Sequence, residues 1–533
     1  MEASAHADVR PRASLELPTA MWRFSGSAWG AIGATAAFIG ITCWWLTQDR
    51  SVPVYDAGVH LATALRYHNM LQAGDLLGPL NHVSQYPPLA HLVGALAIFV
   101  GGANVAPPIV GENLVFVPLL ALGCYQTGKL LFGARAGLLA TIFVLGSPLL
   151  IAQFHVFMLD APETALVAVS LWLLLASEDF KRTRIAGLAG LAVGCGLLVK
   201  VQFPFFLAGI VLFALARGGW REWRALSLFA AAALVVAAPW YIDHIPEFST
   251  IAQFAGSNSG AAPGNLPPLL STADFTWYFW STLNSQLYAP LFVLVLGGAI
   301  WTIASIARGG DRRGLRLEFL VGAFVAWLIV TLTPHHDIRY DMPLMPYLAV
   351  LGCGWIVHLR RAARLAATGL LVLAVAANTL ATTFGVGGLV DSRLVSSPPA
   401  TEAFPDQIVF YSNQAFVVGA PHRDGDVLSL LRELRREGVR VIAFTVEETR
   451  EPDFSYEGLA PLALIAGLGE SLETELVRTD PTVAVLLHRP VSAGSAATCT
   501  RLSDGTGVWV AREDTATGIV EYYCPFHHPR FYG

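Results

Sequence analysis

The sequence contains few charged residues. Only 14% of its 533 residues are Asp, Glu, Lys or Arg, whereas 54% are hydrophobic, and the mean hydropathy is +0.54. A soluble protein needs more polar side chains than this to cover its surface in water. The composition therefore excludes an ordinary soluble protein and predicts a polytopic membrane protein.

An excess of positive charge is also missing. The net charge is -5, and the basic residues gather in short loops between apolar runs, where topology explains them. Nucleic-acid-binding proteins carry a basic patch that can follow a phosphate backbone. The sequence therefore predicts no nucleic-acid partner.

Cysteine is scarce, with six residues in the chain. Four of them lie in apolar runs, where a buried thiol is ordinary. Cys499 and Cys524 lie in the polar tail and would form a disulfide only in an oxidising compartment. The N-terminus shows no small-residue cleavage site behind a short apolar core, so the first apolar run is predicted to be a retained anchor.

Apolar runs bounded by charges predict about eleven transmembrane helices, several of them shorter than the usual ~20 residues. The runs are Trp29–Leu46, Ile109–Leu131, Ala136–Ile151, Ala165–Ala176, Ile185–Val199, Phe203–Leu215, Ala225–Ile242, Leu287–Ile306, Leu317–Leu332, Pro343–His358 and Leu365–Phe384.

Basic residues alternate between loops in a way that orients the chain. Lys and Arg occur in the loops at 129–135, 181–184, 217–224, 308–316 and 360–364, whereas the intervening loops carry almost none. Basic loops stay in the cytoplasm. We therefore expect an integral protein of the cytoplasmic membrane with a cytoplasmic N-terminus and an extracytoplasmic C-terminal domain.

Two apolar regions are ambiguous. Leu89–Val100 would reach only about 18 Å as a helix, short of a hydrocarbon core of about 30 Å, so an interfacial or re-entrant helix is expected there. With Asp56–Leu71, whose spacing is amphipathic, it gives the first outer loop helices that lie along the membrane. Ile185–Leu215 is expected to form two short helices that turn near Lys200, because one long helix would invert the later loops.

The polar tail predicts a separate part of the molecule. We expect a transmembrane module at 1–386, a linker at 387–405 and a small extracytoplasmic α/β domain at 406–533. The predicted strands and helices of the tail are Ile408–Tyr411, Asp426–Glu437 (helix), Val439–Phe444, Ala460–Leu468 (helix), Val483–Leu487, Val508–Ala511 and Ile519–Tyr523. The tail has no phosphate loop, zinc-ligand spacing or nucleophile elbow, which favours an accessory or acceptor-positioning role.

Ionisable residues of the outer loops gather at helix ends. They are Asp56 with His60, His82 with Tyr86, His155 with Asp160, Lys200, and the loop at 335–341. Charged groups near a membrane are costly unless they pair or function, so they indicate a site. Structural alternatives remain open: Asp56 or Asp160 as a helix cap, Lys200 extending to the interface, Tyr86 as part of a loop break, and the turn at 335–339 as a solvated one.

These residue types suit transfer to a hydroxyl group. Asp56 and Asp160 are predicted to be catalytic, because a carboxylate can accept the proton of an attacking hydroxyl. His336 and Arg339 are predicted to bind an anionic ligand such as phosphate, since outer loops otherwise lack positive charge. We predict His60, Tyr86, His155 and Tyr340 as further substrate-binding residues.

The order of several short motifs resembles the C-type glycosyltransferases, and more narrowly the branch of protein O-mannosyltransferases and the lipid A aminoarabinose transferase. After an outer acidic motif and an amphipathic segment, the motifs are Tyr-Pro-Pro-Leu at 86–89, Leu-Asp-Ala-Pro at 159–162, Gly-Leu-Leu-Val-Lys at 196–200, Pro-Trp-Tyr at 239–241 and Arg-Tyr-Asp-Met-Pro-Leu at 339–344. The resemblance covers roughly Trp29 to Phe384 and implies an all-α membrane bundle.

The resemblance also implies an activity. Such enzymes transfer a sugar, with inversion, from a polyprenyl-phosphate donor to a lipid, glycan or protein acceptor on the outer face of the membrane. Asp56 matches the favoured general base, and Asp160 matches the aspartate of the second outer loop. Lys200 and Arg339 fall where family members bind the donor phosphate.

This chain departs from the family pattern at two positions. Ala57 replaces the glutamate that commonly follows the first aspartate, and Gln85-Tyr86 replaces a charged residue before the double proline. These changes remove a second carboxylate from the loop and weaken the case for a metal. No cofactor is predicted, although a divalent metal remains an alternative for which His60, His82 and His155 offer ligands.

Two other function classes compete with an enzyme. A transporter or flippase for a lipid-linked or anionic substrate would also be polytopic, but transporters usually show internal repeats and ionisable residues near the bilayer midplane. The sequence shows no clear repeat, and its outer charges gather at one face. A non-catalytic assembly or sensor protein would leave the combination of Asp56, Asp160, Lys200 and Arg339 without a reason.

Overall fold

The computed structural model describes residues 25–49, 51–53, 55–82, 84, 86–245, 267–309, 312–334 and 336–384, with residues 428, 432, 441–445, 456–467, 484–490, 510–514 and 519–525 of the tail. The linker, the strand expected at Ile408–Tyr411, His335 and Cys499 lie outside the described residues. So does the helix expected at Asp426–Glu437, apart from two residues.

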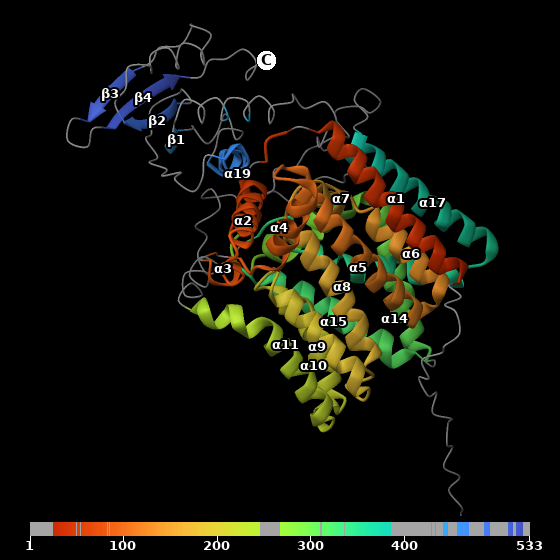
Figure 1. Ribbon diagram of the computed structural model, residues 1–533. Helices are drawn as coiled ribbons and strands as arrows, with labels where there is room; N and C mark the ends of the chain where they lie inside the picture. The colour runs from red at the N-terminus through yellow and green to blue at the C-terminus, as the bar shows by residue number, and fades with distance from the viewer. Residues whose placement is uncertain are drawn as a thin grey trace, which may run out of the picture.

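The described part of the transmembrane module consists of helices (Figure 1). The α-helices are α1 (Gly26–Gln48), α2 (Tyr55–Gln72), α3 (Gly78–Asn81), α4 (Leu89–Gly101), α5 (Ala106–Phe132), α6 (Ala134–Leu145), α7 (Pro148–His155), α8 (Asp160–Ala176), α9 (Thr183–Leu197), α10 (Ala208–Ala216), α11 (Trp223–Asp243), α13 (Thr272–Ser281), α14 (Tyr288–Ala307), α15 (Arg313–Thr331), α16 (Met345–Gly354) and α17 (Arg361–Thr379). Short 3-10 or π-helical turns are η1 (Phe203–Phe206), η2 (Gly219–Arg221), η3 (Thr282–Leu287), η4 (Met342–Leu344), η5 (Ile356–His358) and η6 (Leu380–Phe384).

Several of these helices are long and apolar enough to cross a membrane. Among the described residues there are six, or seven if the bent pair α6 and α7 counts as one span. The six are Gly26–Gln48, Ala106–Phe132, Trp223–Asp243, Thr272–Ala307, Arg313–Thr331 and Arg361–Phe384. The chain is therefore an integral membrane protein, and the larger number of about eleven spans stays a prediction.

Two apolar regions of the sequence each form two helices. The region Ile185–Leu215 forms two helices, as expected, because α9 ends at Leu197 and α10 begins at Ala208. The run expected at Ala136–Ile151 is also divided, with a bend of 61° between α6 and α7. Pro148 is the first residue of α7 and has no backbone N–H to continue the hydrogen bonds of α6.

Small residues let the central helices approach closely. A side chain at Gly123 of α5 would collide with the backbone of Ala168 in α8, and one at Gly137 of α6 would collide with the carbonyl of Tyr125 in α5. Membrane helices commonly pack through such positions, because lipid supplies no hydrophobic force between them. Helix α5 is thereby fixed against both α6 and α8, and α8 begins with Asp160.

The basic loops meet at one end of the bundle. Arg312 donates a hydrogen bond of 2.6 Å to the carbonyl of Leu130, in the last turn of α5. Arg217, after α10, pairs at 3.5 Å with Asp179, after α8. Cations at helix C-terminal ends satisfy carbonyl groups that have no partner within the helix. The helix ends that carry the outer-loop residues of the sequence analysis lie at the opposite end.

In the tail the structure describes helix α19 (Tyr456–Ala466) and the strands β1 (Val441–Thr445), β2 (Ala484–Pro490), β3 (Val510–Asp514) and β4 (Ile519–Pro525). The strands form an antiparallel sheet in the order β1-β2-β4-β3. Figure 1 shows α19 between this sheet and α2, and its Leu464 and Ile465 pack against buried residues that include Trp45 and Leu61. An α/β domain over the whole of 406–533 stays a prediction.

Candidate active site

Helix α2 positions Asp56 and His60. Leu61 and Leu65 of this helix are buried against Trp45 of α1, which fixes one face of α2. Asp56 lies in the first turn and His60 one turn later, so their side chains share another face. The Asp56 side chain is 43% exposed and pairs with an arginine of a distant loop, so its position reflects more than the cap of a helix.

That arginine is Arg339, in the loop between α15 and η4. Its Nη1 donates a hydrogen bond of 2.8 Å to Asp56 Oδ2. Its Nε and Nη2 donate bonds of 3.0 and 2.9 Å to the two carboxylate oxygens of Asp337. The guanidinium group thus holds two carboxylates at once, one by a two-point contact and the other by a single bond.

The second cation, Lys200, lies in the turn between α9 and η1. Its Nζ donates a hydrogen bond of 2.6 Å to Asp160 Oδ1, and Glu163 Oε2 lies 4.0 Å away. Gln202 donates a bond of 3.1 Å to the same oxygen of Glu163. The Lys200 side chain is only 12% exposed. It therefore binds inside the protein instead of extending to the membrane surface.

Tyr340 connects the two cations. It follows Arg339 in the chain, and the ammonium of Lys200 lies 5.5 Å from the centre of its ring. The two charges also influence each other, since Arg339 opposes protonation of Lys200. Asp56, Asp160, Lys200, Arg339 and Tyr340 therefore form one cluster, which we call the charged centre. The α2, α8, α9–η1 and α15–η4 segments contribute to it.

Both cations keep their charge. Burial alone would lower the pKa of Lys200, but Asp160 and Glu163 outweigh it and raise the pKa above its ordinary value. Burial also opposes the charge of Arg339, but Asp337, Asp160 and Asp56 raise its pKa well above the usual range. The charged centre therefore presents two permanent positive charges at any physiological pH.

His60 and Tyr86 form an aromatic wall beside the charged centre. Their rings pack edge to face with centres 4.7 Å apart. His60 Nδ1 also lies 3.1 Å from Nε2 of His91, so the pair shares one proton. Burial, with a smaller contribution from Lys200 and Arg339, lowers the pKa of His60 to about 3. This imidazole is therefore neutral and suits hydrogen bonding better than charge pairing.

His336 lies on the far side of the same loop and serves to hold it. Its Nε2 lies 3.1 Å from Asp274 Oδ1 of α13, and its ring stacks on Tyr278 at 5.1 Å. The side chain is 1% exposed. The structure thus places this predicted phosphate ligand against α13 instead of beside Lys200.

Asp341 anchors the other end of the loop. It accepts hydrogen bonds of 3.2, 2.8 and 2.8 Å from Ser281, Thr282 and Gln286, at the junction of α13 with the π-helical turn η3. Such π-turns are rare and often occur at functional sites. Asp341 and His336 therefore bracket Arg339 and fix its backbone.

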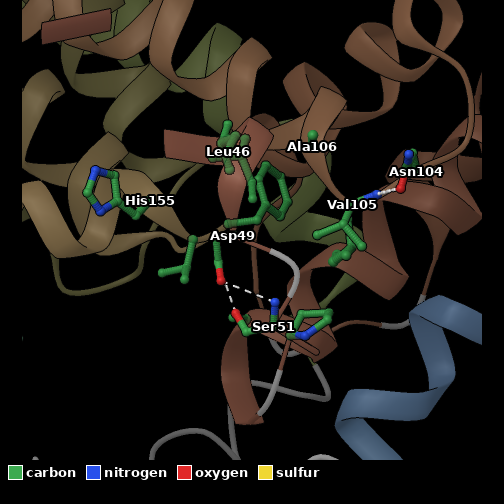
Figure 2. A pocket seen from close by; sticks show the side chains of 13 residues that line it. Leu46, Asp49, Ser51, Asn104, Val105, Ala106 and His155 are labelled. Atoms are coloured by element: carbon green, nitrogen blue, oxygen red, sulfur yellow. Dashed lines mark hydrogen bonds between the residues drawn. The ribbon is translucent and has the colours of Figure 1, made fainter. Parts of the chain in front are cut away.

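His155 is separate from the charged centre. It ends α7, stacks on Trp45 with ring centres 4.1 Å apart, and neither ring nitrogen has a hydrogen-bond partner among the described residues. Together with Asp49, Ser51 and Asn104 it lines a pocket (Figure 2) whose volume, including its open side, is about 530 Å³. Lys200, Asp160 and Arg339 do not line this pocket.

A family model and solved structures provide an independent comparison. Residues 85–242 match the family model described as dolichyl-phosphate-mannose-protein mannosyltransferase. The crystal structure of ArnT from Cupriavidus metallidurans bound to undecaprenyl phosphate has a TM-score of 0.52 and 16% identity, covering 83% of this chain and 78% of ArnT. The apo state of ArnT gives a TM-score of 0.50, 15% identity, and coverage of 82% and 77%. No curated protein matches the chain in sequence.

The chain resembles a C-type glycosyltransferase of the protein O-mannosyltransferase and ArnT type. This confirms the resemblance that the short motifs predicted. The matched segment contains Tyr86, Asp160 and Lys200. The similarity to ArnT shows a shared fold, in which the segments of the charged centre are brought together from both halves of the module.

Sequence reasoning did not assign a role to three polar residues in this ArnT-like fold. Asp337 was predicted only as a member of its loop, and no role was predicted for Glu163 or Gln202. Glu163 could have been found, because it follows Asp160 by three residues in one helix and shares its face. The partnership of Gln202 with Glu163 depends on how α9 turns toward α8 and has no sequence signal. Among the described residues, no group of three or more His, Cys, Asp or Glu side chains is placed to hold a metal ion.

The anchor at Asp341 predicts a pH-dependent stability. Burial, despite hydrogen bonds to the charged form, raises the pKa of this carboxyl group to about 7 from 3.8. The folded protein therefore retains a proton that the unfolded chain loses between pH 3.8 and about 7, and the stability from this group declines as pH rises through that window. The uncharged variant Asp341→Asn should lack this decline.

We compare the midpoint of thermal unfolding of Asp341→Asn with that of the unchanged protein at pH ~5.5 and pH ~8, which lie below and above the pKa. The midpoint of the variant, relative to the unchanged protein, should be higher at the higher pH. The measurement is a thermal scan of the purified protein in detergent at both values. A difference between the two proteins that does not change with pH would contradict the assignment.

Proposed function

We propose that the protein is an inverting glycosyltransferase that moves a sugar from a polyprenyl-phosphate donor to an acceptor on the non-cytoplasmic side of the membrane. The observation that carries this proposal is the charged centre, where Lys200 and Arg339 each bond an aspartate. The match of residues 85–242 to a mannosyltransferase family supports the same class of reaction.

The orientation that we propose follows from the basic loops. With about eleven spans and a cytoplasmic N-terminus, the charged centre lies at the outer face and the C-terminal domain is extracytoplasmic. The basic residues at the other end of the bundle, such as Arg217 and Arg312, then face the cytoplasm. This placement suits an enzyme whose donor sugar has already reached the outer leaflet.

The donor phosphate would be bound by Lys200 and Arg339. Arginine matches the geometry of phosphate oxygens, and a buried lysine supplies a point charge. ArnT was crystallised with undecaprenyl phosphate, a lipid of the chemical class proposed for the donor here. His336, which the sequence also suggests as a phosphate ligand, would contribute by holding the loop of Arg339.

A groove beside this loop suits the lipid chain of such a donor. It has a volume of about 600 Å³, including its open side, and is lined by Thr282, Leu320, Ala323, Phe324, Trp327, Leu344, Tyr347 and Leu348. Besides the indole N–H of Trp327, its polar side-chain groups are the hydroxyls of Thr282 and Tyr347, which donate to Asp341 and to the carbonyl of Phe206. An isoprenoid chain can lie there while its phosphate extends to Arg339.

The chemistry that we propose needs one base and a stabilised leaving group. Asp56, the more exposed carboxylate, accepts the proton of the acceptor hydroxyl as its oxygen bonds to the anomeric carbon. The bond from that carbon to the phosphate oxygen breaks on the opposite side, and the sugar inverts. The charges of Lys200 and Arg339 stabilise the developing polyprenyl phosphate anion. Asp160 holds Lys200 in place, and Tyr86 and His60 border the sugar.

Removal of each central carboxylate should stop transfer. We expect Asp56→Asn to lower sugar release from a polyprenyl-phosphate donor at least ~100-fold, the usual contribution of a positioned proton acceptor. Asp160→Asn should also lower it, because Lys200 loses the carboxylate that holds it in place. The assay uses purified membranes and a radiolabelled donor. Asp49→Asn is the matched control, because Asp49 bonds Ser51 in the same outer loop and lies outside the charged centre. Full activity of both central variants would sink the proposal.

Blocking the groove should affect long donors selectively. A tryptophan at Ala323 would fill the space beside Phe324 and Leu344, so Ala323→Trp should raise the KM for an undecaprenyl donor about tenfold. The KM for a short-chain donor such as a citronellyl phosphate sugar should change little. Ile303→Trp, on an exposed face of α14, controls for added bulk. Equal KM values for the long donor in both variants would contradict the assignment of the groove.

A further inference from the structure

The two carboxylates bound to Arg339 are held very differently. Asp337 takes two bonds from the guanidinium, and its Oδ1 also accepts the backbone N–H of Arg339 at 2.9 Å. Its side chain is 12% exposed. Asp56 takes a single bond, is 43% exposed and belongs to a helix 283 residues away in the chain.

These differences determine which carboxylate yields to a competing anion. The Asp337 contact is two-point and local, within one turn of the chain, so the loop supports it even without α2. Asp56 can leave Arg339 at little cost, because water can reach its carboxylate. An anion that approaches Arg339 therefore displaces Asp56 and leaves Asp337 in place.

The bond between Asp56 and Arg339 also has a chemical consequence. Asp56 Oδ2 accepts a hydrogen bond from Arg339 Nη1. While it does so, this oxygen is not available to accept the proton of an acceptor hydroxyl. Its release from Arg339 would free the oxygen for that purpose.

We propose that Asp337 is a positioning residue that fixes Arg339, so that the donor phosphate exchanges with Asp56 alone and thereby frees Asp56 to act as the base. The proposal rests on the proposed function, since it assumes a phosphate on Arg339. It implies an order of events, in which donor binding precedes proton transfer from the acceptor. No covalent bond changes in this step; only hydrogen bonds are exchanged.

The two carboxylates should therefore affect phosphate binding in opposite directions. Asp56→Asn removes a competitor for Arg339 and should tighten binding of undecaprenyl phosphate about threefold. Asp337→Asn leaves Arg339 free to turn toward Asp56 and should weaken binding about tenfold. Loss of a negative charge alone would tighten binding in both variants, so the opposite signs distinguish positioning from simple electrostatics.

The experiment measures undecaprenyl phosphate binding to the full-length protein in lipid nanodiscs. Asp337→Glu restores a carboxylate and should recover most of the affinity lost in Asp337→Asn, which a fold defect would not do. Asp179→Asn is the matched control, because Asp179 pairs with Arg217 at the other end of the bundle, and its affinity should equal that of the unchanged protein.

The outcomes separate the two proposals. Tighter binding, or unchanged binding, in Asp337→Asn overturns the positioning role while leaving the proposed function in place. Weaker binding in Asp56→Asn overturns the exchange. If the unchanged protein itself does not bind undecaprenyl phosphate, the proposed donor is wrong and the proposed function fails with it.

Discussion

The ion pairs of Lys200 and Arg339 are the contacts on which the site depends. Lys200 joins the turn after α9 to the first turn of α8 through Asp160. Arg339 joins the loop before α16 to the first turn of α2 through Asp56. Removing one partner of a buried pair leaves an uncompensated charge, which costs far more than the pair contributes. The fold must therefore keep Lys200 and Asp160 together, whereas the partly exposed Asp56 can separate from Arg339.

The surrounding structure serves to hold these pairs in register. Asp341 and His336 attach the Arg339 loop to α13 and η3 on either side of the guanidinium. Helix α2 is held from another direction, because its apolar face packs on Trp45 and on Leu464 and Ile465 of α19. The tail thus contacts the helix that carries Asp56. The accessory role that the sequence predicts for the tail would act on Asp56 through this contact.

The sequence predicted the module and the residues of the charged centre because both depend on local signals. Apolar runs indicate membrane helices, and charges in outer loops are few enough that Asp56, Asp160, Lys200 and Arg339 stand out. The turn at Lys200 was predicted because one long helix would have inverted the basic loops. The bend at Pro148 was not, since its run reads as one apolar segment.

Partnerships between distant segments were beyond the sequence. Which aspartate meets which cation depends on how α2, α8 and the Arg339 loop pack, and no spacing encodes it. For the same reason His336 and His155, which look like site residues in the chain, lie against α13 and Trp45. Glu163 differs from these residues, because helical spacing alone predicts that it lies on the same face of α8 as Asp160.

The most direct test of this account is the structure of the protein with undecaprenyl phosphate bound, determined in a lipid nanodisc. The phosphate oxygens should lie within hydrogen-bond distance of both Lys200 and Arg339. The bond between Asp56 and Arg339 should be absent, while both bonds to Asp337 persist. A phosphate bound elsewhere, or bound with Asp56 still on Arg339, would contradict it.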